Sequence, residues 1–213
     1  MPEPRMGGQK AWRVFLCESH DVLDSLLSLR DGGGRLDKGL RELVRGKYPD
    51  VEIQPVRASG GPLMAGAVDI VVLSAQPAVT AGMAVEEFKR SLIDQIRQIK
   101  QQLNAHVIVY NCSSVDPGDH VYNYHGIPDT FAIRVNRANL ALMQISQMEG
   151  ISIIDVERIV GHLAGEKVVK GPLDYTDETY AAMGQEFVRV MEDIGFFENR
   201  PLVMQVGEAA AAR

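Results

Sequence analysis

Short apolar runs alternate with longer segments of helical periodicity along most of this 213-residue chain. Five of these runs predict strands: Val14–Cys17, Val51–Val56, Val68–Leu73, Ala105–Tyr110 and Ile151–Val156. A short apolar run is typical of a strand that is buried on both faces, as in a parallel sheet. Strands that alternate with helices imply right-handed crossovers between parallel strands. The sequence therefore predicts an α/β fold, a three-layer sandwich around a five-stranded parallel sheet of flavodoxin-like order 2-1-3-4-5.

The segments between the runs carry the apolar stripes of amphipathic helices. The stripes are Val85, Phe88, Leu92, Ile96, Ile99 and Leu103; Phe131, Val135, Ala138, Leu142, Ile145 and Met148; and Tyr180, Met183, Phe187, Val190 and Ile194. We interpret the methionines of the second segment as core filler and Gly150 as its C-cap. The run Val51–Val56 is predicted to be an edge strand, because Pro55 has no N–H to donate to a neighbouring strand.

Length and composition narrow the class of protein. We expect a single α/β domain over residues 1–213, with its core at about 12–196, a loose N-terminal arm and a C-terminal tail. The net charge of −6 argues against nucleic acid or an anionic membrane as a partner. The N-terminal segment lacks the apolar region of a secretory signal, and no apolar run is long enough to span a bilayer. Cys17 and Cys112 are expected to be reduced and buried, which favours a cytoplasmic protein.

Small and polar residues gather where the predicted strands end. Glu18–Asp21 follows the first run, a loop containing Gly60 and Gly61 follows the second, and Ser74–Pro77 follows the third. The long loop Asn111–Thr130 follows the fourth. Ligands of open α/β sheets bind outside the carboxyl ends of the strands, so we expect the chemistry of this chain at these segments.

Ser19 stands in the first of these segments and has two interpretations. It lies at or near the N-terminus of a predicted helix, where free backbone N–H groups favour the negative charge that develops around a nucleophile. The alternative is that Ser19 or Asp21 only caps this helix, which is the commoner role of such residues.

The order of the segments resembles the SGNH (GDSL-type) hydrolase family over residues 13–194. Leu16–Ser19 resembles the apolar strand and Gly-Asp-Ser of that family, which implies that Ser19 is the nucleophile. The resemblance further implies an oxyanion hole formed by the N–H groups of Ser19 and a glycine, Gly61 in preference to Gly60, and by the amide of Gln76. Gln76 stands in Ser74-Ala75-Gln76-Pro77, where the family has Gly-x-Asn-Asp.

The last block departs most from the family pattern. Asp174-Tyr175-Thr176-Asp177 stands where the family has Asp-x-x-His, so Asp177 takes the place of the histidine base. A serine hydroxyl needs a base, and a carboxylate with an ordinary pKa of about 4 is much weaker than imidazole. Two routes remain open: Asp177 assisted by Asp174, or a histidine of the long loop, His125 in preference to His120.

Three functions follow from these observations. The first is an SGNH-like serine ester hydrolase or acyl transferase that acts on a small acyl ester with an atypical base. The alternative is a catalytically degenerate SGNH-fold protein that binds or scaffolds, since a fold does not fix a function. A nucleotide or flavin binder is disfavoured, because the sequence has neither GxGxxG nor a P-loop. The sequence has no HxxxH or HExxH motif, so no metal site is expected. No cofactor is expected either, and the oligomeric state is left open.

Overall fold

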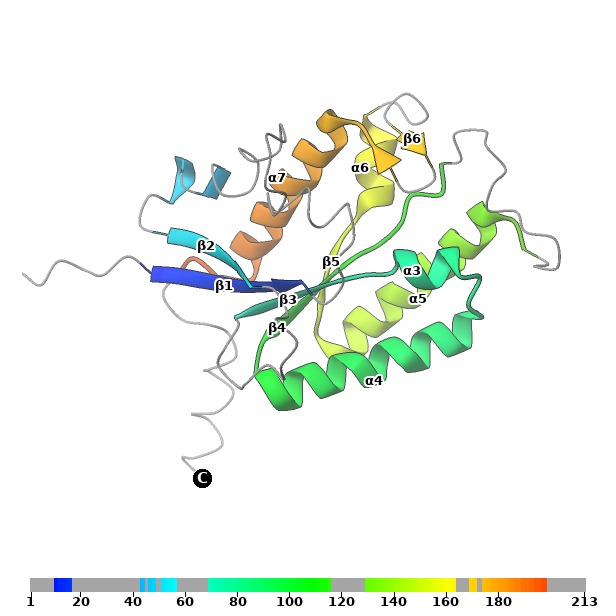
Figure 1. Cartoon of the computed structure of the whole chain (residues 1–213), viewed down its shortest axis with the longest axis horizontal. Helices are drawn as coiled ribbons and strands as arrows, with labels where there is room; N and C mark the ends of the chain where they lie inside the picture. Colours follow the sequence, from blue (N-terminus) through cyan, green and yellow to red (C-terminus); the bar gives the residue numbers. More distant parts are fainter. Residues whose placement is uncertain are drawn as a thin grey trace, which may run out of the picture.

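The computed structural model describes residues 10–16, 43–44, 46–48, 51–56, 69–115, 129–163, 169–171 and 174–198. Its centre is a sheet of five strands in the order β2-β1-β3-β4-β5 (Figure 1). The strands are β1 (Lys10–Leu16), β2 (Val51–Val56), β3 (Ile70–Ser74), β4 (His106–Tyr110) and β5 (Ser152–Ile154). Neighbouring strands pair in parallel throughout this sheet, in the order that the sequence predicts.

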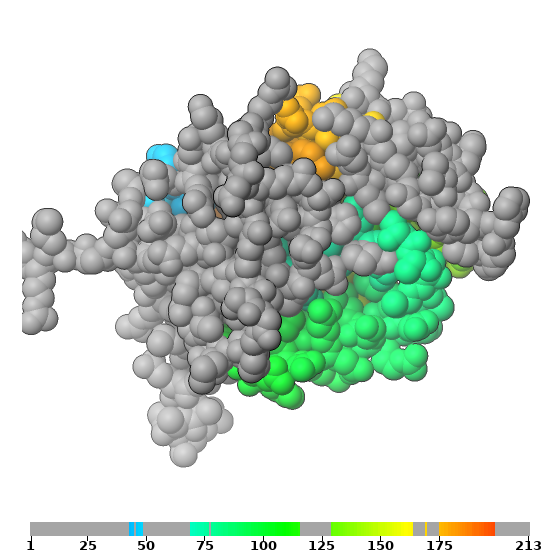
Figure 2. Space-filling view, viewed as in Figure 1, coloured from blue at the N-terminus to red at the C-terminus, as the bar shows by residue number. Residues whose placement is uncertain are grey.

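Helices cover both faces of the sheet. They are α3 (Gln76–Thr80), α4 (Val85–Leu103), α5 (Phe131–Glu149), α6 (Val156–His162) and α7 (Asp177–Asp193). The α4 and α5 helices lie on one face, and α6 and α7 lie on the other (Figure 1). The α3–α4 segment and α7 also appear on opposite sides in the space-filling view (Figure 2). A short antiparallel ribbon of β6 (Val169–Gly171) and β7 (Asp174–Tyr175) precedes α7.

The core is divided by the sheet, because successive side chains of a strand point to opposite faces. Val71 of β3 and Val109 of β4 belong to the core that packs against α4 and α5. Val72 of β3 and Ile108 of β4 belong to the core that packs against α7. All four side chains are fully buried, which explains why their runs are apolar without alternation.

The ends of several elements differ from the prediction. β1 begins at Lys10, and Lys10 and Ala11 pair in register with β2. The prediction that the core begins at about residue 12, after a loose arm, is therefore wrong for these two residues. β5 ends at Ile154, earlier than predicted, because the side chain of Asp155 accepts a hydrogen bond from the Arg158 N–H and caps α6. Neither α6 nor the β6–β7 ribbon is predicted from the sequence.

The methionines of α5 also contradict the prediction. Met143 and Met148 are 59% and 64% exposed, so their interpretation as core filler is wrong. Phe131, Leu142 and Ile145 occupy the buried side of the same helix, and the two methionines project away from it. None of the helices in the described part of the chain has the length and apolarity to cross a membrane.

Candidate active site

The carboxyl ends of β3, β4 and β5 are joined by hydrogen bonds at one edge of the sheet. The Ala75 N–H, just after β3, donates to the Tyr110 carbonyl at the end of β4, at 3.0 Å. The Asn111 N–H, just after β4, donates to the Ile154 carbonyl at the end of β5, at 3.2 Å. The residues that follow these three strands therefore start from one common edge, and the site is predicted at this edge.

Gln76 is the residue of the predicted oxyanion hole that the structure describes. It is the first residue of α3 and is 4% exposed. Its backbone N–H donates to Ser74 Oγ at 3.2 Å, and its carbonyl accepts from Thr80 Oγ1 at 3.0 Å. These contacts hold the backbone of Gln76 at the carboxyl end of β3, the position that the family resemblance assigns to the amide donor.

A cavity of about 290 Å³ lies beside α3. Its walls include Val79 of α3, Phe88 of α4 and Ala138 of α5, together with Arg134 and Arg137. Ala78, which also lines the cavity, is two residues beyond Gln76 in the chain. Its size lies at the lower end of the range for ligand pockets, which suits a small apolar group.

The turn before α7 carries the predicted base. Asp174 lies in β7, and Asp177 is exposed in the first turn of α7. Thr176 caps this helix by accepting a hydrogen bond from the Thr179 N–H. A carboxylate in the first turn is stabilised by the positive end of the helix dipole, so Asp177 has a structural role as well.

Tyr175 fixes the position of this turn. Its side chain is 2% exposed, and burial, with a smaller contribution from Cys112, raises its pKa. Cys112 and Ser113, just after β4, lie close enough to the Tyr175 hydroxyl to influence its pKa. The turn that carries Asp174 and Asp177 therefore lies against the carboxyl end of β4.

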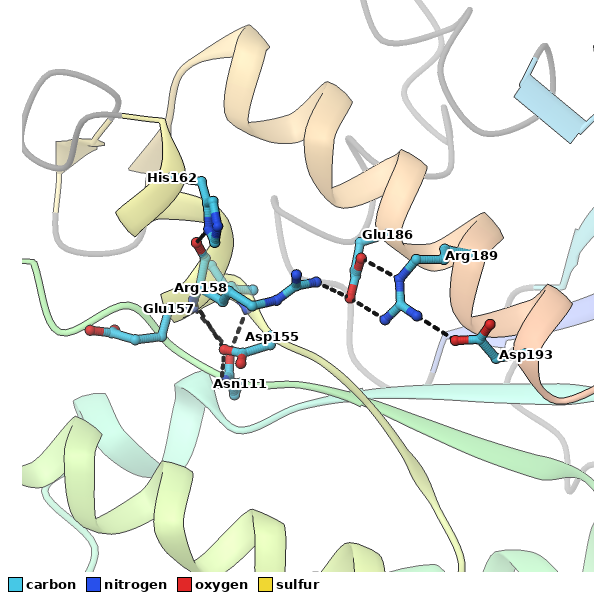
Figure 3. Close-up of polar contacts among 9 residues, drawn as sticks. Asn111, Asp155, Glu157, Arg158, His162, Glu186, Arg189 and Asp193 are labelled. Atoms are coloured by element: carbon cyan, nitrogen blue, oxygen red, sulfur yellow. Dashed lines mark hydrogen bonds and ion pairs between the residues drawn. The ribbon is translucent and has the colours of Figure 1, made fainter.

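A second polar group, not predicted from the sequence, occupies the ends of β4 and β5 (Figure 3). Asn111 Nδ2 donates to Asp155 Oδ1 at 2.9 Å, and Asn111 Oδ1 accepts from the Val156 N–H at 2.6 Å. The backbone N–H and the hydroxyl of Ser114 both donate to the carboxylate of Glu157. These side chains join two strand ends and the start of α6, so their polar atoms are used by the fold.

Several predicted site residues, Ser19, Gly60, Gly61, His120 and His125, lie outside the described residues, as do Cys17 and Asp21, so their roles stay predictions. Two other histidines are described. His106 is at the opposite edge of the sheet, where Nε2 lies 2.9 Å from Ser152 Oγ, and burial with the nearby Lys100 lowers its pKa to about 4. His162 is exposed at the end of α6.

Cys112 is buried as predicted, and burial, with a smaller contribution from Glu157, raises the pKa of its thiol to about 12. Cys112 is therefore a protonated thiol at neutral pH and a poor nucleophile. Among the described residues, no group of three or more His, Cys, Asp or Glu side chains is arranged to hold a metal ion.

Comparison with solved structures identifies the fold. A member of the lipolytic protein G-D-S-L family from Veillonella parvula superposes with a TM-score of 0.57 at 14% identity, over 85% of this chain and 98% of that chain. The acetylxylan esterase Axe2 from Geobacillus stearothermophilus gives 0.59 at 12% identity, over 87% and 95%. The acetyl xylan esterase AlAXEase gives 0.54 at 11% identity, over 83% and 98%.

The chain thus has the α/β fold of the SGNH (GDSL-type) hydrolases, and the proteins that share it include esterases. No model of a known protein family matches the sequence, and no curated protein is detectably similar to it. At these identities the likeness identifies the fold, and the chemistry has to be argued from the residues of this chain.

Proposed function

We propose that this chain is an SGNH-like serine ester hydrolase or acyl transferase with Ser19 as its nucleophile. The observation that carries the proposal is the register of β1 and β3, which are neighbours and pair Leu16 with Val72. Ser19 follows Leu16 by three residues, and Gln76 follows Val72 by four. These counts support the proposal that the serine and the amide donor act on one reacting carbonyl, because both are counted from paired residues of adjacent parallel strands.

The reaction proceeds in two steps. Ser19 Oγ attacks the acyl carbonyl carbon while its proton passes to a base, and the carbonyl oxygen becomes an oxyanion. Donors from Ser19, Gly61 and Gln76 stabilise this oxyanion, which is the largest single contribution in such sites. The alcohol leaves with a proton, and water in a hydrolase, or a second alcohol in a transferase, attacks the acyl-serine in the same way to release the acyl group.

The substrate that we propose is a small acyl ester. The cavity of about 290 Å³ next to α3 supports this choice. Most of its lining residues are apolar, and one of them, Ala78, is two residues beyond Gln76 in the chain. Two of the structural neighbours are acetyl xylan esterases, which is consistent with a short acyl group. We also propose a cytoplasmic protein with one α/β domain over residues 1–213.

The base remains a choice between two routes. The position of the family histidine is taken by Asp177, and Asp174 lies three residues before it on β7. The burial of Tyr175 supports the first route, because Tyr175 lies between the two aspartates in the chain and is close to Cys112, just after β4. The second route uses His125 of the loop that follows β4.

A degenerate binding or scaffolding protein is the second candidate. The observation that favours it is the exposure of Asp177 in the first turn of α7. There the helix dipole stabilises the carboxylate, and this structural role alone explains an acidic residue at that position.

Hydrolysis of p-nitrophenyl acetate by the wild type and five variants separates the two candidates. The enzyme proposal expects turnover by the wild type, loss in Ser19→Ala, and loss in either Asp177→Asn or His125→Ala. Ser91→Ala and Asp94→Asn are matched controls, since both side chains are exposed on α4. Turnover that survives Ser19→Ala would exclude Ser19 as the nucleophile, and a folded but inactive wild type would favour the binding protein.

A further inference from the structure

The exposed residues of α5 include several large apolar side chains. The buried side of this helix packs into the core against the sheet, and we call its exposed residues the outer face of α5. They are Ile133, Asn136, Arg137, Leu140, Met143, Gln144, Gln147 and Met148. Ile133, Leu140, Met143 and Met148 are between 43% and 64% exposed, and among the described residues no other element exposes a large apolar side chain.

The neighbouring helix α4 has an ordinary solvated face. α4 and α5 lie side by side on the same face of the sheet (Figure 1). The exposed residues of α4 are polar or charged, among them Glu86, Arg90 and Asp94. Large apolar side chains gathered on one exposed helix face are instead typical of a surface that another molecule covers.

The outer face of α5 has no unpaired acidic group. Arg137 is its only charged residue, and Asp129 pairs with it within the chain. At the end of the helix, Glu149 accepts hydrogen bonds from Arg97 of α4. The whole chain has a net charge of −6, so two copies repel each other unless they meet through a surface without exposed negative charge. The outer face of α5 is such a surface, whereas the face of α4 exposes acidic side chains.

The order of residues along the outer face is complementary to itself. Ile133 and Met148 lie at equal distances from the midpoint between positions 140 and 141, and so do Arg137 and Gln144. Two α5 helices that meet antiparallel about this midpoint therefore bring an apolar side chain opposite an apolar one. They also bring a guanidinium opposite an amide, whose oxygen can accept a hydrogen bond from it.

We propose that the outer face of α5 binds a second copy of this chain across a two-fold axis near Leu140. The two α5 helices pack antiparallel, with Leu140 of each copy against Leu140 of the other and Met143 beside this central pair. Side chains alone make the contact, since packed helices lie about 8–10 Å apart. A two-fold axis makes the contact isologous, so that one surface serves both partners.

The pattern of the outer face selects a second copy as the occupant. A copy supplies an apolar side chain opposite each of Ile133, Leu140 and Met148, and a neutral amide opposite Arg137. Arg137 keeps its pair with Asp129 in this arrangement, whereas a partner with a carboxylate at that place would meet Asp129 as a like charge. An anionic membrane suits the face less well, because the chain as a whole is acidic.

Sedimentation velocity over a wide range of protein concentration tests this assignment. The wild type should form a dimer that dissociates on dilution. Leu140→Glu should raise the dissociation constant by about tenfold or more, because two carboxylates then meet at the axis. Gln185→Glu is the matched control: it adds the same charge at an exposed position of α7, on the opposite face of the sheet.

A second pair of variants tests the antiparallel arrangement. Gln144→Arg places a guanidinium opposite Arg137 of the other copy and should weaken the dimer. Gln144→Glu places a carboxylate there and should strengthen it. Each change should be roughly two- to tenfold, because one exposed ion pair contributes little and the dimer contains two. Circular dichroism should show every variant folded like the wild type, since Leu140, Gln144 and Gln185 are exposed.

A wild type that stays monomeric up to millimolar concentration would overturn the proposal. A dimer that Leu140→Glu and Gln185→Glu weaken equally would place the contact away from α5 and would also overturn it. A dimer that both Gln144 variants weaken would contradict the antiparallel arrangement. Co-sedimentation of a monomeric wild type with phosphatidylcholine vesicles would assign the outer face to a membrane surface instead.

Discussion

Two groups of polar residues follow strands of the sheet in the sequence, and they differ in the role that we assign to them. Asn111 and Asp155, at the ends of β4 and β5, bond to one another and to the start of α6. Ser19 and Gln76, after β1 and β3, stand where the SGNH resemblance has a nucleophile and an amide donor. A polar residue after a parallel strand is therefore an ambiguous signal until its partners are known.

The comparison separates stability from activity. The Asn111–Asp155 group should contribute to the free energy of unfolding and leave ester hydrolysis unchanged. The motif positions should contribute mainly to hydrolysis. The expected effects of variants fall in order from the base and the amide donor to Asn111 and last to Glu186, an ion-paired residue of α7 outside both groups.

Removal of the base should cost roughly 100- to 10,000-fold in kcat, the usual contribution of a general base. The pH profile of kcat/KM identifies the route. A limb at a pH of about 6.5 that His125→Ala removes would assign the histidine route. A profile without that limb, together with loss in Asp177→Asn, would assign the carboxylate route. Full activity in both variants would contradict both routes.

Replacement of the amide donor should have the next largest effect. Gln76→Ala should lower kcat by about 100- to 1,000-fold, the range for one oxyanion-hole donor. Gln76→Asn keeps the amide and should retain most of the activity, while Gln98→Ala, exposed on α4, controls for an unrelated glutamine. Equal activity in the alanine variant and the wild type would remove Gln76 from the site.

Asn111→Ala should lower the free energy of unfolding by about 1–3 kcal/mol, because it leaves the Val156 N–H and the Asp155 carboxylate without a partner that they now have. Urea unfolding measures this change. Asn136→Ala, exposed on α5, should stay within about 0.5 kcal/mol of the wild type. A loss of hydrolysis in folded Asn111→Ala would break the division between the two groups.

Glu186 should give the smallest effect, a change in the pH dependence of stability. Hydrogen bonds from Arg189, and then from Arg158, hold its pKa below the ordinary value of 4.5. Because the folded-state pKa is the lower one, its contribution is fully present above pH 4.5 and is lost as the pH falls through the folded-state pKa. Thermal unfolding between neutral and acid pH should show a flatter dependence in Glu186→Gln. The same pH dependence of thermal stability in Glu186→Gln and the wild type would contradict the lowered pKa of Glu186.

Much of the fold could be predicted because its signals are local. The apolar stripe of α4 runs from Val85 to Leu103, as predicted, and Asn104 ends the helix in the left-handed conformation at φ 53°. Gly150 ends α5 in the same way, at φ 59°. The edge position of β2 is also confirmed. It could be predicted because Pro55 lacks an N–H whatever its surroundings are.

The missed features depend on contacts between distant residues. The apolar run 151–156 gives no sign that Asp155 divides it, since Asn111 reaches Asp155 from 44 residues away. The signal that was available is the aspartate itself, a good N-cap residue directly after a strand. Met143 and Met148 fit helical spacing, but spacing alone does not show which part of a helix another element covers. Gln76 follows β3, as predicted, while the site roles of Ser19, Gly61, Gln76 and His125 stay predictions.

Covalent labelling by a fluorophosphonate tests the central claim most directly, because such a reagent reacts with an activated serine and loses fluoride as the phosphorus–oxygen bond forms. Peptide mapping by mass spectrometry locates the adduct. The account predicts one adduct on Ser19 that inhibits p-nitrophenyl acetate hydrolysis and is absent from Ser19→Ala. An adduct on another residue, or full hydrolysis after labelling of Ser19, would contradict it.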